Sequence, residues 1–171
     1  SKLESGRLVL EEVSFDLLQL MADVTSLVNA QLLEMKLSHH THRKNLKHTI
    51  LLGSPTRLRQ IMLNLFSNAI KYNKPGGSIS IHAKIIRQVH QNVIYKFIIS
   101  DTGIGISPEF QKHIFEPFAQ EDTGARTIYK GTGLGMAIVH RLVQEMGGTI
   151  QLKSEKNVGS TFTLILPFTI D

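Results

Sequence analysis

The chain has 171 residues, of which 42% are hydrophobic, and it carries a formal net charge of +5. This length suits one domain with a substantial core, and the lack of cysteine excludes disulfides and thiolate metal sites. Basic residues are spread along the chain without an aromatic-rich basic stretch, and no apolar run approaches the roughly 18 residues of a membrane span, so we expect neither a nucleic-acid partner nor a membrane helix.

The first part of the chain is predicted to hold one helix followed by an extended segment. Residues 1–10 read as the end of a preceding linker, so we expect the domain to span 11–171. Between Ser14 and Met35 apolar residues recur at helical spacing, with Ser14 or Asp16 as the N-cap. Residues 37–53 are predicted to be extended and to end in a short apolar strand. The apolar positions of the helix are Leu17, Leu20, Met21, Val24, Leu27 and Val28.

The next element is predicted to be a helix from Pro55 to Asn73. Ser54 is a favourable N-cap, and proline is favoured at the first helical position. At 100° per residue, five apolar side chains fall on one stripe, which should face the core. They are Leu58, Ile61, Met62, Leu65 and Ala69.

A second, polar stripe lies beside the apolar one on this predicted helix. It consists of Asn64, Asn68 and Lys71, with Tyr72 at its border. Asparagine is a poor helix former, so a row of this kind needs an explanation. Either the two amides bond locally to the backbone, or they face a cavity, where an amide oxygen suits Mg²⁺ and the lysine suits a phosphate.

The second half of the chain is predicted to alternate paired strands with helices. Two β-rich runs joined by a short turn indicate a hairpin, and another hairpin is predicted near the C-terminal end. Paired strands with helices between them predict an α+β fold, with helices on one face of a mixed sheet. In chain order the elements span 78–89 and 92–100 (first hairpin), 107–115 (short capped helix), 116–131 (a long loop typical of a lid), 132–148 (helix) and 149–168 (last hairpin).

The stretch SDTGIGIS, at 100–107, follows a predicted strand and carries an aspartate and two closely spaced glycines. Asp101 has two interpretations: a turn-forming residue, or a carboxylate at the mouth of an apolar pocket that accepts a hydrogen bond from an amine such as that of adenine. Hydrophobic residues before DTG also resemble the loop of an aspartic protease, where two aspartates share a proton. That class is nearly all β, and the three long helices predicted here argue against it.

Two other patterns are weak on their own. KGTGLGMA, at 130–137, opens a predicted helix whose free N–H groups suit a phosphate, but it lacks a Walker-type ending and a preceding apolar strand. The histidines of the extended segment have no neighbouring carboxylate, so we favour a solvated basic strand over a metal site. They are His39, His40, His42 and His48, and the second and third share a strand face.

Four segments taken in order resemble a known family. RLRQIMLNLFSNAIKYNKPGG, SDTGIGIS, IFEPFAQED and KGTGLGMAIVHRLVQEMGG look like the N, G1, F and G2 boxes of sensor histidine kinase catalytic domains, which share a superfamily with gyrase B, heat-shock chaperones and mismatch-repair ATPases. The resemblance covers about residues 10–168, and residues 1–17 are similar to the link after the dimerisation helices of hybrid-type kinases. It implies a two-layer α/β sandwich, with three main helices on one face of a mixed sheet, that holds Mg-ATP under a mobile lid.

The resemblance also implies a role for individual residues. Asp101 matches the aspartate that bonds the adenine amine, and Gly103 and Gly105 let the backbone approach the base. Asn68 matches the Mg²⁺ ligand, and Asn64 a polar residue that helps to position the chemistry. Further nucleotide contacts are implied for Lys71, Tyr72, Ile106, Phe118, Thr161 at the adenine end, Arg126 and Lys130 in the lid, and Gly131, Thr132, Gly133, Leu134 and Gly135 at the next helix.

Two departures from the family pattern are small, and one absence is larger. Asn73 stands where the family often has threonine, and Met136 where it often has leucine. The family's phosphoacceptor histidine, followed by an acidic residue and an arginine, has no counterpart in SHHTHRKN. The chain therefore resembles the ATP-binding half alone.

The function that the resemblance implies is protein-histidine kinase activity. The γ-phosphoryl group of ATP passes to a histidine on a separate dimerisation domain and then to the receiver domain of a response regulator. The domain is expected to be cytoplasmic and monomeric when isolated, within a parent that a membrane segment can anchor. Two alternatives stay open: a conformational ATPase clamp, although those families place glutamate where Asn64 stands, and a nucleotide-binding pseudokinase, although every motif residue is present.

Overall fold

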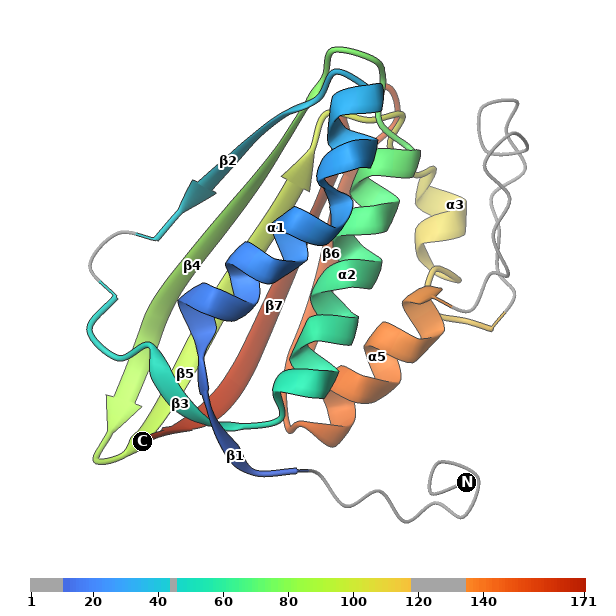
Figure 1. Ribbon diagram of the computed structural model, residues 1–171. Helices are drawn as coiled ribbons and strands as arrows, with labels where there is room; N and C mark the ends of the chain where they lie inside the picture. Colours follow the sequence, from blue (N-terminus) through green and yellow to red (C-terminus); the bar gives the residue numbers. More distant parts are fainter. Residues whose placement is uncertain (1–10, 44–45, 118–134) are drawn as a thin grey trace.

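The structure is a computed structural model that describes residues 11–43, 46–117 and 135–171. These ranges form two layers, a twisted mixed sheet and a layer of helices that covers one of its faces (Figure 1). The α+β fold predicted from the sequence, with three main helices on one face of a mixed sheet, is thereby confirmed. The predicted lid lies largely within 118–134, outside the described residues.

The sheet has seven strands in the described ranges, in the order β1-β3-β7-β5-β4-β2, with β6 also paired to β7. Strand β2 runs parallel to β4, and the other pairs are antiparallel. The strands are β1 (Val13–Asp16), β2 (Ser38–His42), β3 (Ile50–Gly53), β4 (Ser78–Val89), β5 (Asn92–Asp101), β6 (Thr149–Glu155) and β7 (Gly159–Ile170), and the helices are α1 (Leu17–Glu34), α2 (Pro55–Lys71), α3 (Pro108–Gln111) and α5 (Gly135–Glu145).

Helix α1 begins one residue after its predicted cap. Asp16 is the N-cap, and its Oδ1 accepts hydrogen bonds from the backbone N–H of Leu18 at 2.9 Å and of Gln19 at 3.3 Å. Ser14, the other candidate, lies in β1 instead. The predicted apolar positions are buried except Leu27, which is 63% exposed. Periodicity therefore located the helix and its inner face, with an error of one position.

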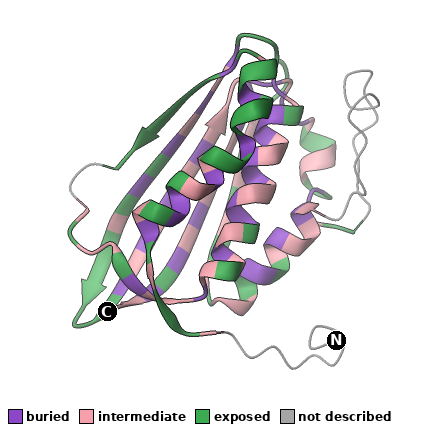
Figure 2. Cartoon of the chain, viewed as in Figure 1, coloured by how far each residue is buried: buried purple, intermediate pink, exposed green. Residues whose placement is uncertain are grey.

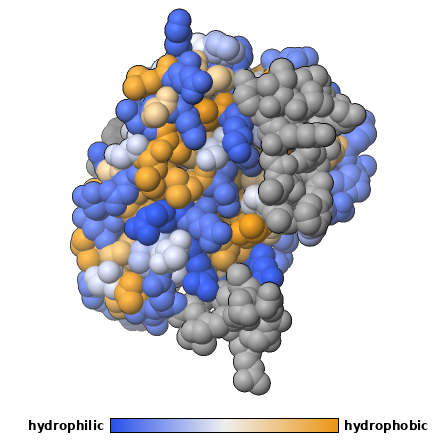
Figure 3. Space-filling model, turned by 45° about the vertical axis from the view of Figure 1, so that its right-hand side comes forward, coloured by the Kyte–Doolittle hydropathy of each residue, from blue (hydrophilic) through white to orange (hydrophobic). Residues whose placement is uncertain are grey.

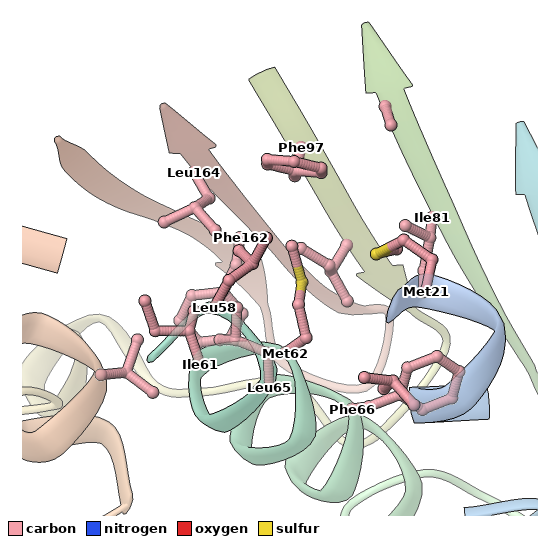
Figure 4. Close-up of a cluster of buried hydrophobic side chains, with 14 of the residues drawn as sticks. Met21, Leu58, Ile61, Met62, Leu65, Phe66, Ile81, Phe97, Phe162 and Leu164 are labelled. Atoms are coloured by element: carbon pink, nitrogen blue, oxygen red, sulfur yellow. The ribbon is translucent and has the colours of Figure 1, made fainter. Parts of the chain in front are cut away.

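Helix α2 supplies the centre of the core. All five residues of the predicted apolar stripe are at most 4% exposed, and Leu58, Ile61, Met62 and Leu65 lie between α2 and the sheet (Figure 4). On the sheet side, buried residues of β5 and β7 alternate with partly exposed ones that point away from the helices, as the buried and intermediate colours along each strand show (Figure 2). The inward residues of these two strands include Tyr95, Phe97, Ile99, Phe162, Leu164, Leu166 and Phe168.

The start of α2 is fixed by a double cap. Ser54 Oγ accepts from the Arg57 N–H at 3.3 Å, as its predicted N-cap role requires. Glu11 adds a carboxylate, whose Oε1 accepts from Ser54 Oγ at 3.1 Å and from the Thr56 N–H at 3.0 Å. These bonds, chiefly those with Thr56, lower the pKa of Glu11 below its usual 4.5. No local sequence pattern marks this contact, because Glu11 precedes β1 and lies 43 residues before Ser54.

We expect the Glu11 cap to stabilise the protein at neutral pH and not in acid. Because its pKa is lowered on folding, its contribution is present above about pH 4.5 and is lost as the pH falls through the lower folded value. Glu11→Gln should therefore lower the melting temperature at pH 7, and the difference from the parent should shrink toward pH 3. Glu12→Gln, at an exposed neighbouring position, is the control, and a pH-independent difference would contradict the cap.

The short helix predicted over 107–115 is shorter in the structure. Ser107 caps it as expected, with Oγ accepting from the Phe110 N–H at 3.3 Å. Regular α-helix ends at Gln111, because the next bonds run from His113 N to the Phe110 carbonyl and from Glu116 N to the His113 carbonyl, three residues back. None of the described helices is long and apolar enough to cross a membrane.

Candidate nucleotide-binding site

A pocket opens where the C-terminal half of α2 meets the end of β5, the start of β7 and the first turn of α5. It is small, at about 30 Å³, and open to the surface. The lining residues are Asn68, Ala69, Tyr72, Asp101, Gly105, Ile106, Ile114, Met136, Ser160 and Phe162.

Asp101 lies at the last position of β5, on the face that the helices cover. Its side-chain Oδ1 accepts hydrogen bonds from the backbone N–H of Gly103 at 2.8 Å and of Ser160 at 3.3 Å. These two bonds fix the carboxylate against the loop and against β7. The pocket thus combines a positioned, half-buried carboxylate with apolar walls such as Ile106 and Phe162, an arrangement suited to a flat heterocycle that carries an amine.

The two glycines of SDTGIGIS are required by close approaches of the protein backbone. A Cβ on Gly103 would overlap the carbonyl oxygen of Tyr72, the residue that ends α2. Gly105 has φ +71°, and a Cβ there would overlap the carbonyl oxygen of Glu155 at the end of β6. These glycines therefore let the loop pack closely against the backbone of Tyr72 and Glu155. The resemblance implies a second role for them, which is to let the backbone approach the base of a nucleotide.

A buried network joins this loop to the end of α2. Asn73 is 6% exposed; its Nδ2 donates to the Ser78 carbonyl at 3.1 Å, and its Oδ1 accepts from Thr102 Oγ1 at 3.1 Å. Thr102 Oγ1 in turn accepts from the Ser78 N–H at 2.9 Å. The helix that carries Asn68 and the loop that follows Asp101 are therefore held together by side chains. Asn73 departs from the family pattern, and its contact with Thr102, 29 residues away, has no local sequence signal.

We expect Asn73→Ala to weaken nucleotide binding as well as the fold. The change removes the two hydrogen bonds that the Asn73 side chain makes to the Ser78 carbonyl and to Thr102 Oγ1, each worth about 0.5–1.5 kcal/mol. Because the network positions the pocket, the dissociation constant for ATP should rise by roughly tenfold, measured at a temperature where the variant is folded. Asn73→Thr, the residue common in the family, should recover part of both effects, and Lys74→Ala is the exposed neighbouring control. Unchanged affinity in Asn73→Ala would limit the network to stability.

The polar stripe of α2 runs toward the pocket but enters it only in part. Asn68 and Tyr72 line the pocket. Asn64, one turn earlier, is half-buried outside the pocket lining, and Lys71 is exposed at the last position of the helix. Gly135, the first residue of α5, has open space where a Cβ would stand. The remaining predicted contacts, Phe118, Arg126, Lys130, Gly131, Thr132, Gly133 and Leu134, lie outside the described residues.

The structure does not bring Thr161 into the pocket. Strand pairing places Thr161 opposite Ser100, and the two hydroxyls are 2.9 Å apart on the face away from the helices. Its neighbour Ser160 pairs with Asp101, is 7% exposed and lines the pocket. Because strand residues alternate between faces, two adjacent residues of β7 cannot both face the pocket. Here the hydroxyl of Ser160 faces it, and this hydroxyl lies 2.8 Å from Ser154 Oγ.

A larger cleft, of about 470 Å³, lies at the other end of the sheet. Its walls include Leu52 and Gly53 of β3, Pro167 and Phe168 of β7, and Met146 after α5. None of the sequence-predicted site residues lines it, so the smaller pocket around Asp101 is the candidate site. The molecule shows apolar patches separated by hydrophilic side chains in the view of Figure 3.

The fold and the pocket define the class: a two-layer α/β sandwich with a carboxylate-bearing pocket between its helices and sheet. Residues 53–170 match the family described as histidine kinase-, DNA gyrase B- and HSP90-like ATPases. The chain belongs to this family.

Relatives of known name cover nearly the whole chain. It is 38% identical to the signal transduction histidine-protein kinase BarA of Escherichia coli over 171 residues, which is 95% of this chain and 18% of that protein. It is 35% identical to the hybrid signal transduction histidine kinase B of Dictyostelium discoideum, over 98% of this chain and 8% of that protein. The chain thus spans a fifth or less of the length of these two relatives.

Solved structures agree with the fold. Full-length ShkA in complex with AMPPNP superposes with a TM-score of 0.79 at 30% identity, over 96% of this chain and 32% of that one. The histidine kinase ThkA in complex with the response regulator protein TrrA superposes with a TM-score of 0.73 at 25% identity, over 98% of this chain and 45% of that one. The sandwich built here from pattern and packing is therefore the one that these kinases contain.

Proposed function

We propose that this chain is the ATP-binding catalytic domain of a sensor histidine kinase. It holds ATP while the γ-phosphoryl group passes to a histidine on a separate dimerisation domain, for relay to the receiver domain of a response regulator. The observation that carries the proposal is the meeting of Asp101 from β5 and Asn68 from α2 in one pocket. The complex of a similar kinase with AMPPNP supports ATP as the ligand, and the complex of another with a response regulator supports the partner.

The composition of α2 favours phosphoryl transfer over hydrolysis. An ATPase of this superfamily needs a carboxylate on this helix to activate water, and α2 contains no aspartate or glutamate. Asn64 and Asn68 supply neutral amides instead, which cannot take a proton from water. A conformational ATPase clamp is therefore the weaker candidate.

The residues fit the magnesium ion that the family uses. The amide oxygen of Asn68 is a hard neutral ligand suited to Mg²⁺, which in nucleotide sites is shared between few protein ligands and the phosphates. Lys71, exposed at the end of the same helix, is placed to meet a phosphate. When bound, the ion neutralises phosphate charge. The chain's own residues orient the nucleotide, and Ile106, Ile114 and Phe162 exclude water from its base.

We infer the wider context from the same family membership. The domain works in the cytoplasm and is monomeric when isolated. It meets its dimerisation domain within the parent protein. That parent is either a hybrid kinase or a kinase that acts on a separate regulator. Residues 11–171 form the catalytic domain, and residues 1–10 are the end of the link from the dimerisation helices.

Calorimetry tests the proposal on the chain itself. ATP and ADP should both bind, and the affinity for ATP should rise when Mg²⁺ is added, because Asn68 would hold an ion that neutralises phosphate charge. The affinity of Asn68→Ala should gain less from Mg²⁺, whereas Gln60→Ala, on the same helix at an exposed position, should behave as the parent does. A folded sample that shows no heat with either nucleotide would refute the proposed function.

A further inference from the structure

The loop that follows β5 supplies one apolar wall of the nucleotide pocket. Ile106, in this loop, lines the pocket and is 4% exposed. It comes directly after Gly105, which has φ +71°, and glycine gives a loop more backbone freedom than any other residue. The place of the Ile106 side chain therefore depends on what holds the backbone around it.

Two side chains hold the backbone of Ile106, one at each of its polar groups. Its N–H donates to Ser154 Oγ of β6 at 2.8 Å. Its carbonyl accepts from Nε2 of Gln111, the last residue of α3, at 2.7 Å. Both side chains are partly buried, where a hydrogen bond is stronger than it is in water.

The two side chains are also joined to each other and to the pocket. Gln111 Nε2 donates its second N–H to the main-chain carbonyl of Ser154 at 3.1 Å, so both donors of the amide are used. Ser154 Oγ donates to the Gly159 carbonyl at 3.0 Å and lies 2.8 Å from the hydroxyl of Ser160, which lines the pocket. We call Gln111 and Ser154 together the Ile106 clamp.

Ile104, two residues earlier in the same loop, is held in a different way. Its N–H donates to the Tyr72 carbonyl at 2.9 Å, and its carbonyl accepts from the Asn157 N–H at 2.7 Å. Both are main-chain hydrogen bonds, which no change of side chain removes directly. A substitution in the Ile106 clamp should therefore release Ile106 and leave Ile104 in place.

We propose that Gln111 and Ser154 are positioning residues for nucleotide binding, because they fix the backbone of Ile106 and so hold its side chain against the base. The inference rests on the proposed function, since it takes the ligand of the pocket to be a nucleotide. Neither residue of the clamp lines the pocket, so both act through Ile106. A wall that is fixed before the ligand arrives reduces the entropy lost on binding.

A purely structural role for the Ile106 clamp predicts different results. If the clamp only attached α3 to β6, its removal would lower the melting temperature and leave the affinity of the folded protein unchanged. If it positions the wall, the folded protein binds ATP more weakly, and Ile106 becomes more mobile than Ile104. Each variant is therefore measured at a temperature where it is folded.

The first test measures the affinity of the whole chain for ATP by calorimetry. Gln111→Met keeps the length of the side chain and removes both donors, so the dissociation constant should rise about fivefold, the factor that one lost hydrogen bond gives. Ser154→Ala should have a similar effect, and Ser154→Thr, which keeps a hydroxyl, should recover most of the affinity. Lys112→Met places the same new residue at the exposed neighbouring position and should bind ATP as the parent does.

The second test measures the motion of isoleucine methyl groups by NMR relaxation, which reports the picosecond to nanosecond range. Without nucleotide, the order parameter of the Ile106 methyl group should fall in Gln111→Met. That of Ile104 should keep the value of the parent, because its main-chain hydrogen bonds remain. Lys112→Met should change neither methyl group.

Two results would overturn the positioning role. One is an affinity for ATP within about twofold of the parent in either Gln111→Met or Ser154→Ala, and the other is an equal loss of order at Ile104 and Ile106. Should Gln111→Met not fold, Gln111→Glu takes its place, since an ionised carboxylate of the same shape cannot donate. Normal ATP binding by the parent with unaffected variants refutes this inference alone, whereas a folded parent chain that binds no nucleotide refutes the proposed function.

Discussion

Asp101→Ala is expected to lower the affinity for ATP and ADP by ten- to a hundredfold. A hydrogen bond that involves a charged group contributes roughly 1.5–3 kcal/mol, and each 1.4 kcal/mol is a factor of ten in the dissociation constant. The adenine amine is the donor that the carboxylate suits at the apolar pocket. Calorimetry on the variant and the parent measures the difference, with Glu34→Ala, an exposed change on α1, as the control.

The alanine variant also removes bonds within the protein, so a second variant is needed. Oδ1 of Asp101 accepts from the N–H of Gly103 and of Ser160, and its loss loosens the loop. Asp101→Asn keeps an oxygen for these donors but loses the charge, so its stability should stay near the parent's while ATP binding falls. GTP should bind the parent poorly, because its ring presents a carbonyl where adenine has the amine. Equal affinity for ATP and GTP would count against Asp101 as the selector.

Local chemistry explains why the helices could be predicted. The apolar stripe and the Ser54 cap of α2 depend on residues within one turn of one another, and every residue of that stripe is buried. The same holds for the hairpin of β4 and β5, where alternation and a two-residue turn define both strands. Leu27, predicted to be buried and in fact exposed, shows the limit, because the stripe of a helix is wider than the face that its neighbours cover.

Long-range pairing explains what could not be predicted. Thr161 and Ser160 differ by one position, and which of them meets the pocket depends on the register of β7 against β5, which places Ser160 opposite Asp101. Likewise, Asn73 contacts Thr102 across 29 residues, and no local pattern marks that pair. Ser160 lies two positions before the buried Phe162, so strand alternation places both side chains on the inward face. This spacing is the sequence signal that would have favoured Ser160 over Thr161 as the pocket residue.

The second large effect concerns the reaction. Alone, the chain should neither phosphorylate itself nor hydrolyse ATP quickly, because phosphoryl transfer requires donor and acceptor in line and α2 offers no carboxylate to activate water. Adding the cognate dimerisation domain in trans should yield a label on that partner that is labile in acid and stable in base, as a phosphohistidine is. Asn68→Ala should abolish the label by removing the Mg²⁺ ligand, whereas Gln60→Ala should leave it.

Asn64→Glu separates the kinase from the ATPase interpretation. It places a carboxylate on α2 at the position that ATPases of the superfamily use, one turn before Asn68. If position alone decides the chemistry, hydrolysis of ATP by the isolated chain should rise while transfer to the dimerisation domain falls. The readouts are phosphate release and partner labelling on the same sample, with Asn64→Gln as the neutral control of similar size. An acid-stable label on this chain alone would place the acceptor on one of its hydroxyls, and the histidine kinase mechanism would be wrong.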